Sequence, residues 1–127
     1  MDVVDLDFTT LHFYDKYLIS HIKDDVVLDE AKTQNLINLC QEYYKGSPYV
    51  YLSKRKGSYN VVPMVYLNLW ENPELLGIGI ICEEIIKCKM AEFEKNFSSV
   101  PFQIFYTMES AVHWVESLHE KKIKAGL

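Results

Sequence analysis

Polar and apolar residues alternate regularly near the start of the chain. Within residues 10–22 the alternation is interrupted once, at the polar pair Asp15-Lys16. This pattern predicts a hairpin of two antiparallel strands whose turn contains that pair. One face is the more apolar and is expected to meet the core; it carries Leu11, Phe13, Leu18 and Ile22. The other face carries Thr10, His12, Tyr14, Tyr17, Ile19 and His21.

Further along the chain, apolar residues recur at three- and four-residue steps, which indicates helices. Helices are predicted over about 27–45, 62–70 and 83–97, and from Met108 onward. Pro63 suits a first helical turn because it needs no amide partner there, and Gly46 can take the left-handed conformation that ends a helix. Thr107 can cap the last helix through its hydroxyl group. In the third helix, one apolar stripe contains Ile86, Met90, Phe93 and Phe97.

Three apolar runs between these helices predict strands, at residues 49–53, 75–82 and 101–106. The second run, LLGIGIIC, lacks alternation, which is typical of a central parallel strand covered on both faces. Its Gly77 and Gly79 lie on one face, where they would let a helix or a ligand approach closely. The resulting order, ββαβαβαβα, predicts an α/β fold with a mixed, mostly parallel sheet of about five strands and four helices.

The composition limits the class of protein. The 127 residues fit a single domain, spanning 1–127, and 49% of them are apolar, which predicts a packed core. A net charge of −5 argues against general nucleic-acid binding, because the phosphate backbone would be repelled. No apolar run approaches the ~20 residues that a membrane span needs. The acidic start, MDVVDLDF, differs from a signal peptide, so we expect a cytoplasmic protein.

The chain has three cysteines, Cys40, Cys82 and Cys88. Their spacings match no zinc or redox motif, and all three lie among apolar neighbours. We therefore expect buried, reduced thiols.

Other candidate chemistry is sparse. His12 and His21 would be diagonal neighbours on the hairpin, about 7–8 Å apart, with Asp24 or Asp25 as the only nearby third metal ligand. The sequence contains no GxxxxGK or GxGxxG phosphate loop and no GxSxG nucleophile frame. The sequence thus predicts no catalytic residues, no metal and no cofactor, and a protein that is not an enzyme.

Several segments carry a resemblance to a known family. They are SKRKGSYNVVPMVY, LLGIGIIC, AEFEKNF, PFQIF and TMESAVHWV, and with the element order they extend from about residue 8 to 118. The chain resembles the SpoIIAA-like fold of STAS domains and anti-anti-sigma factors, and more specifically the small uncharacterised STAS/SEC14-type proteins of Bacteroidetes-like bacteria. In anti-anti-sigma proteins, a partner kinase phosphorylates a serine after the central strand. Ser58 occupies the comparable place, although Lys-Gly-Ser-Tyr replaces the usual Asp-Ser-Ser-Gly-type sequence.

The segment KRKGSYNVVP, residues 54–63, is the densest basic cluster of the chain. It leaves the carboxyl end of the third predicted strand, and ligands of open α/β sheets bind outside such ends. The candidate partner- or anion-binding residues are Lys54, Arg55, Lys56, Gly57, Ser58 and Tyr59. Three cations in a row can equally form a solvated turn, since loop backbones face water.

Two functions follow from different classes. The first is a non-enzymatic, STAS-like regulatory domain that binds an unknown protein partner through residues 54–60 and the following helix. The second is a carrier for a small lipophilic ligand or an anion, as lipid-transfer relatives of this fold class imply, with an apolar pocket near Gly77 and Gly79. Large apolar side chains at most strand positions favour a filled core and thus the first. Either function is compatible with a homodimer.

Overall fold

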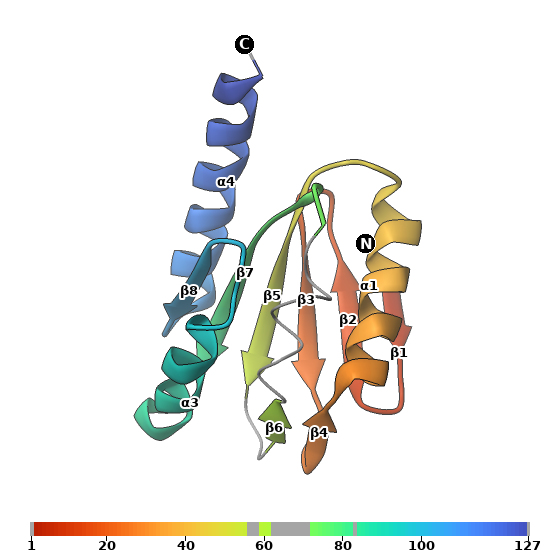
Figure 1. Cartoon of the computed structure of the whole chain (residues 1–127), viewed down its shortest axis with the longest axis vertical. Coiled ribbons are helices and arrows are strands. Elements are labelled where there is room, and N and C mark those ends of the chain that lie inside the picture. The colour runs from red at the N-terminus through yellow and green to blue at the C-terminus, as the bar shows by residue number, and fades with distance from the viewer. Residues whose placement is uncertain (1, 56–58, 62–71, 83, 127) are drawn as a thin grey trace.

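A computed structural model describes residues 2–55, 59–61, 72–82 and 84–126 of the chain. Six strands form one sheet in the order β1-β2-β3-β5-β7-β8 (Figure 1). Their bounds are β1 (Asp2–Asp5), β2 (Thr9–Phe13), β3 (Tyr17–Ile22), β5 (Tyr49–Arg55), β7 (Leu75–Cys82) and β8 (Phe102–Phe105). Pairing is antiparallel from β1 to β3 and parallel from β3 to β8, so the predicted mixed, mostly parallel α/β sheet is confirmed.

The number of strands is larger than the five predicted. All five predicted strands are present, but β1 adds a sixth at one edge of the sheet. Two short strands, β4 (Val26–Leu28) and β6 (Tyr59–Val61), pair parallel in a separate sheet. Strands of three or four residues are too short to display a period of two, which is why the pattern did not reveal them.

The described residues include three helices: α1 (Glu30–Tyr44), α3 (Ile85–Lys95) and α4 (Met108–Ala125). The helix predicted at 62–70 lies outside the described residues. The Asp29 side chain accepts a hydrogen bond from the Lys32 amide at the start of α1, and Thr107 caps α4 by accepting one from the Ser110 amide. Among the described helices, none has both the length and the apolar character that a bilayer span requires.

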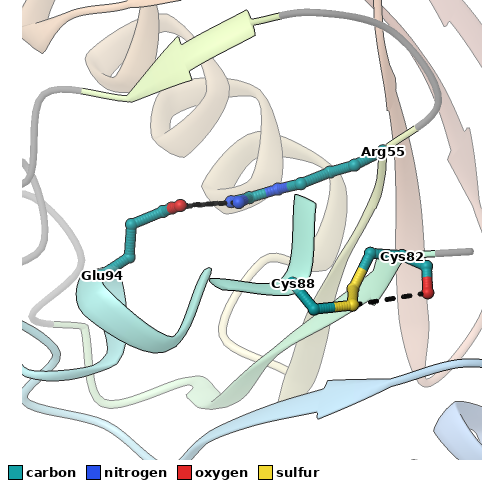
Figure 2. Close-up of a disulfide and its surroundings, with 4 residues drawn as sticks. All are labelled: Arg55, Cys82, Cys88 and Glu94. Atoms are coloured by element: carbon teal, nitrogen blue, oxygen red, sulfur yellow. Dashed lines mark hydrogen bonds and ion pairs between the residues drawn. A yellow bond between two sulfur atoms is a disulfide. The ribbon is translucent and has the colours of Figure 1, made fainter. Parts of the chain in front are cut away.

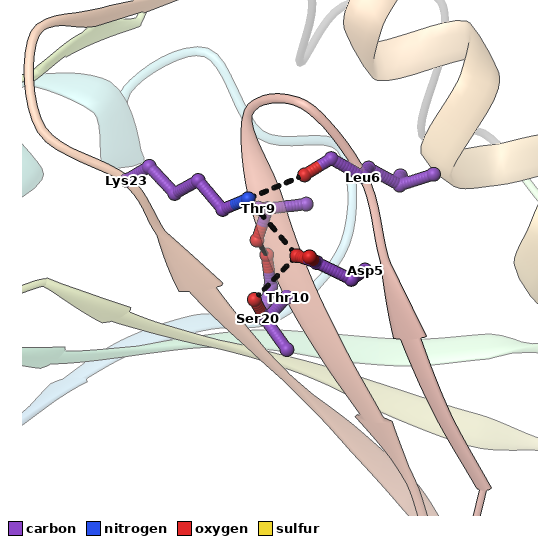
Figure 3. Close-up of polar contacts among 6 residues, drawn as sticks. All are labelled: Asp5, Leu6, Thr9, Thr10, Ser20 and Lys23. Carbon is purple, nitrogen blue, oxygen red and sulfur yellow. Dashed lines mark hydrogen bonds and ion pairs between the residues drawn. The ribbon is translucent and has the colours of Figure 1, made fainter.

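The hairpin of β2 and β3 forms in the predicted register. Phe13 lies opposite Leu18 and Leu11 opposite Ser20, so the apolar face meets the core as expected. On that face the hydroxyl groups of Thr9 and Ser20 lie 2.7 Å apart and satisfy each other (Figure 3). Burial of these two hydroxyl groups is possible because each gains the other as a partner.

The two faces of the sheet are covered by different helices. One face packs against α1 and α3, through residues such as Leu36 and Ala91. The other packs against α4, through Ala111, Val115 and Leu118. The last turns of α4 extend beyond the sheet (Figure 1). The sheet is therefore the middle of three layers.

Gly77 and Gly79 of β7 leave room for helix α4 to pack closely, rather than for a ligand. A Cβ atom added at Gly77 would lie 2.8 Å from both Leu118 Cδ1 and Trp114 Cη2. One added at Gly79 would lie 2.6 Å from Leu52 Cδ2 and 3.3 Å from Trp114 Cζ3. The side chains of α4 fill the space above both glycines, so the predicted apolar pocket at this position is absent.

Candidate functional site

The carboxyl ends of β5 and β7 meet at one edge of the sheet, where Arg55 lies directly beside Cys82. This is the edge at which open α/β sheets bind ligands. Of the six predicted site residues, Lys54 and Arg55 are described in full, while Tyr59 begins β6, whose backbone pairs with β4. Lys56, Gly57 and Ser58 lie outside the described residues, as does the Tyr59 side chain.

Strand geometry separates the two described cations. Side chains alternate between faces along β5, so Arg55 continues the row of Tyr49 and Tyr51 toward α1 and α3. Lys54 continues the row of Val50 and Leu52 on the α4 face, where it is half-buried. Lys54 and Arg55 therefore do not form one cationic surface.

Arg55 is buried and paired with Glu94 of α3. Each residue is 3% exposed, and the guanidinium donates two hydrogen bonds to the carboxylate, of 2.6 Å from Nη1 to Oε2 and 2.7 Å from Nη2 to Oε1 (Figure 2). Such a bidentate pair is among the strongest polar contacts in proteins. The expectation that Arg55 offers its charge to a partner or an anion is wrong: its guanidinium fastens α3 to β5.

A disulfide joins Cys82, the last residue of β7, to Cys88 in the second turn of α3 (Figure 2). The S–S distance is 2.03 Å and the two Cα atoms lie 5.9 Å apart. The expectation of reduced thiols is therefore wrong for these two residues. It is confirmed for Cys40, which is free and buried, and whose thiol pKa is raised by burial to about 12.

The sequence does contain signals for the ion pair between Arg55 and Glu94. Glu94 follows Cys88 and Ala91 at helical steps of three, so a carboxylate falls on the inward stripe of α3. Period-two alternation along β5 places Arg55 in the row that faces the same helix. A charged residue of each sign, both directed inward, indicates a buried ion pair, because an isolated buried charge is too costly.

The outward side of α3 carries two exposed apolar side chains, Met90 and Phe93, among the charged residues Lys89, Glu92 and Lys95. Met90 is 47% exposed and Phe93 is 57% exposed, and the Phe93 ring lies 5.3 Å from the Phe97 ring, centroid to centroid. Of the predicted apolar stripe, Met90 and Phe93 face solvent, whereas Phe97 is partly buried against the core. The opposite side of the helix, with Cys88, Ala91 and Glu94, is the one attached to the sheet.

The predicted histidine pair also forms. The rings of His12 and His21 are in edge-to-face contact with centroids 4.9 Å apart. Among the described residues, no three histidine, cysteine, aspartate or glutamate side chains come together as metal ligands would. The two rings therefore form a contact on the sheet.

Comparison with known proteins gives the fold. No protein-family model matches the chain, and no curated protein matches it. A crystal structure of an uncharacterised protein of the DUF3478 family from Shewanella loihica PV-4, described as having a SpoIIAA-like fold, matches with a TM-score of 0.57. The identity is 15%, over 84% of this chain and 91% of the other. The chain thus has the SpoIIAA-like α/β fold that its element order and segments predicted.

Proposed function

We propose that this domain is a non-enzymatic, STAS-like interaction module that binds a protein partner. The proposed binding residues are those of the segment 54–60, apart from the buried Arg55, together with the outward side of α3. The main support for the proposal comes from the way α3 is held. Its inward side is fixed by a disulfide and an ion pair, while the side chains of Met90 and Phe93 are exposed on its outward side. Exposed aromatic and methionine side chains are enriched at protein interfaces.

Fixing the helix lowers the cost of binding. An interface residue on a mobile segment loses conformational freedom when the partner docks, and that loss reduces affinity. Two attachments on the inward side of α3, at Cys88 and at Glu94, remove most of this loss before the partner arrives. A preformed helix with exposed Phe93 therefore supports an interaction surface.

Regulation through Ser58 belongs to the same proposal. A phosphate added there would place about two negative charges two positions from Lys56 in the sequence. In anti-anti-sigma relatives of the fold, this modification separates the partners. We extend that behaviour to this chain as part of the proposal, with the partner unidentified.

The test is capture of a partner followed by binding with purified components. The full chain is immobilised, the captured protein is identified and purified, and its affinity is measured by calorimetry. We expect Met90→Ala with Phe93→Ala, Lys56→Glu, and Ser58→Asp each to weaken binding by about tenfold or more. The matched control is Ile123→Ala, because Ile123 is equally exposed, at 66%, but lies on the last turn of α4.

The results separate the candidate functions. Loss of affinity in the α3 and loop variants, with Ile123→Ala unchanged, supports the interaction module. A captured protein that binds all variants equally would reject this surface. Native mass spectrometry of the freshly purified chain covers the carrier alternative, since a small molecule retained at one equivalent would favour it.

A further inference from the structure

The outer edge of β1 is a second candidate surface, at the opposite border of the sheet from β8. β1 pairs with β2 on one side, and no strand among the described residues pairs with its other side. The Leu6 amide donates to the Thr9 carbonyl at 2.8 Å, which makes Leu6, Val4 and Asp2 the hydrogen-bonded positions toward β2. The N–H and C=O groups of Val3 and Asp5 therefore point outward.

The strand is held in place at its carboxyl end. Lys23, which follows β3, donates from Nζ to Asp5 Oδ1 at 2.9 Å and to the Leu6 carbonyl at 2.8 Å (Figure 3). The Thr10 hydroxyl donates to the same Asp5 oxygen at 3.0 Å. These contacts fix the outward backbone groups of β1 as a template for one more strand.

A groove runs beside this template on the α1 face of the sheet. It has a volume of about 380 Å³, and its apolar lining consists of Val4, Phe13, Leu39 and Tyr43. The Phe13 and Tyr43 rings stack with centroids 4.4 Å apart. Alternate side chains of a strand added to β1 would point to this face, so the groove would receive the apolar ones.

The charges around the groove are mostly negative. Glu42 lines it together with Lys45. Asp2 lies on the same face of β1 as Val4, which lines the groove. Burial, and then the charges of Asp2 and Asp15, raise the pKa of Tyr43. An acidic border of this kind favours lysine and arginine on the incoming strand.

The same charges disfavour a second copy of the chain. β1 reads DVVD, so a second copy would bring its own Asp2 and Asp5 to an edge that already carries these two carboxylates. Repulsion between the like charges weakens such a pairing. The edge is therefore suited to a different chain.

We propose that the outer edge of β1 binds an extended peptide segment, which joins the sheet as a further strand and directs apolar side chains, flanked by basic ones, toward the groove. This surface is separate from the one on α3, so either proposal can fail without the other. The outward amide of Val3 would donate to the peptide backbone, and the apolar side chains of the peptide would enter the groove of Val4, Phe13 and Tyr43.

The test uses a fluorescein-labelled peptide of sequence KTVTVTK, whose lysines and valines share one face of a strand, titrated into the full chain. We expect saturable binding, and no binding of the matched ETVTVTE peptide. Val3→Pro removes one outward donor without touching the ladder to β2, and should weaken binding by about tenfold. Val3→Ala keeps that donor and is the matched control, with affinity within about threefold of the wild type.

A second measurement keeps the test decisive if Val3→Pro fails to fold. Amide chemical shifts of the wild-type chain are followed during the titration. Shifts centred on Val3 and Asp5 support the proposal. Equal affinity of Val3→Pro and Val3→Ala, shifts centred on β8 instead, equal binding of the two peptides, or a β1-mediated dimer in sedimentation experiments would each overturn it.

Discussion

Arg55 and Glu94 are 39 positions apart in the chain, yet they meet in the interior through two hydrogen bonds of 2.6 and 2.7 Å. Arg55→Ala would leave a buried carboxylate without its guanidinium. We expect a loss of about 3–5 kcal/mol in the free energy of unfolding, measured by urea denaturation. The double variant Arg55→Met with Glu94→Leu removes both charges and should lose less than Arg55→Ala alone. A loss under about 1 kcal/mol for Arg55→Ala would contradict the buried pair.

The Cys82–Cys88 disulfide is expected to stabilise the fold modestly, because the loop it closes is short. Cys88→Ser, or reduction of the wild type, should lower the free energy of unfolding by about 2 kcal/mol. Thermal melting with and without reductant measures this. The control is Cys82→Ser with Cys88→Ser, whose melting temperature should not respond to reductant. An equal response of this control would show that the effect comes from elsewhere.

The disulfide also bears on the location of the protein. Disulfides are uncommon in the cytosol, where glutathione and thioredoxin systems keep thiols reduced. The predicted cytoplasmic location stays a prediction. Acid quenching of the native cells, alkylation of the denatured chain and mass spectrometry would show the redox state: three alkylated cysteines mean a reduced protein, and one, Cys40, means the disulfide is formed.

The contact between α4 and β7 should tolerate no added methyl group. Gly79→Ala would bring its Cβ within 2.6 Å of Leu52 Cδ2, and Gly77→Ala within 3.1 Å of the Pro101 carbonyl oxygen. We expect each to destabilise by about 1–3 kcal/mol in urea denaturation. Gly126→Ala is the matched control, because its nearest neighbour would lie 3.5 Å away. Wild-type stability in Gly77→Ala or Gly79→Ala would show that α4 sits farther from the sheet.

The stability of the fold should fall in acid because the Asp29 carboxylate, which caps α1, becomes protonated. The backbone hydrogen bond from Lys32 holds the pKa of Asp29 below its ordinary value of 3.8. A carboxylate with a lowered pKa stabilises the fold above its unfolded pKa, and this contribution is lost as the pH falls through the folded value. The melting temperature should therefore decline below about pH 4. Asp29→Asn keeps a capping oxygen without the charge, so its decline should be smaller. An identical decline would assign the acid sensitivity to other groups.

The elements that the sequence predicted well are those whose pattern spans many residues. Alternation alone was enough to predict the hairpin from Thr10 to Ile22. Helical periodicity, with capping residues at Asp29 and Thr107, was enough to predict α1 and α4. The run LLGIGIIC was recognisable as a central strand because it is apolar throughout. Local patterns of this kind determine elements and their order, and the order was enough to indicate the fold.

The errors arose where a contact joins distant parts of the chain. Arg55 looked like a surface cation because its sequence neighbours Lys54 and Lys56 are cations, but its partner Glu94 comes from another element. Met90 and Phe93 formed the more apolar stripe of α3, yet the disulfide and the ion pair turned the opposite stripe inward. Periodicity can indicate that each side chain points inward, but not which residue it will meet, since that depends on how two elements pack.

Helix α3 has two fastenings of different chemical kind, one covalent near its start and one ionic near its end. A thiol reductant can release only the first, and strong acid acts only on the second. After reduction the helix would keep a fixed point at Glu94, and the motion left to it would be a pivot of its amino end away from the tip of β7. Detachment of the whole helix requires both conditions together.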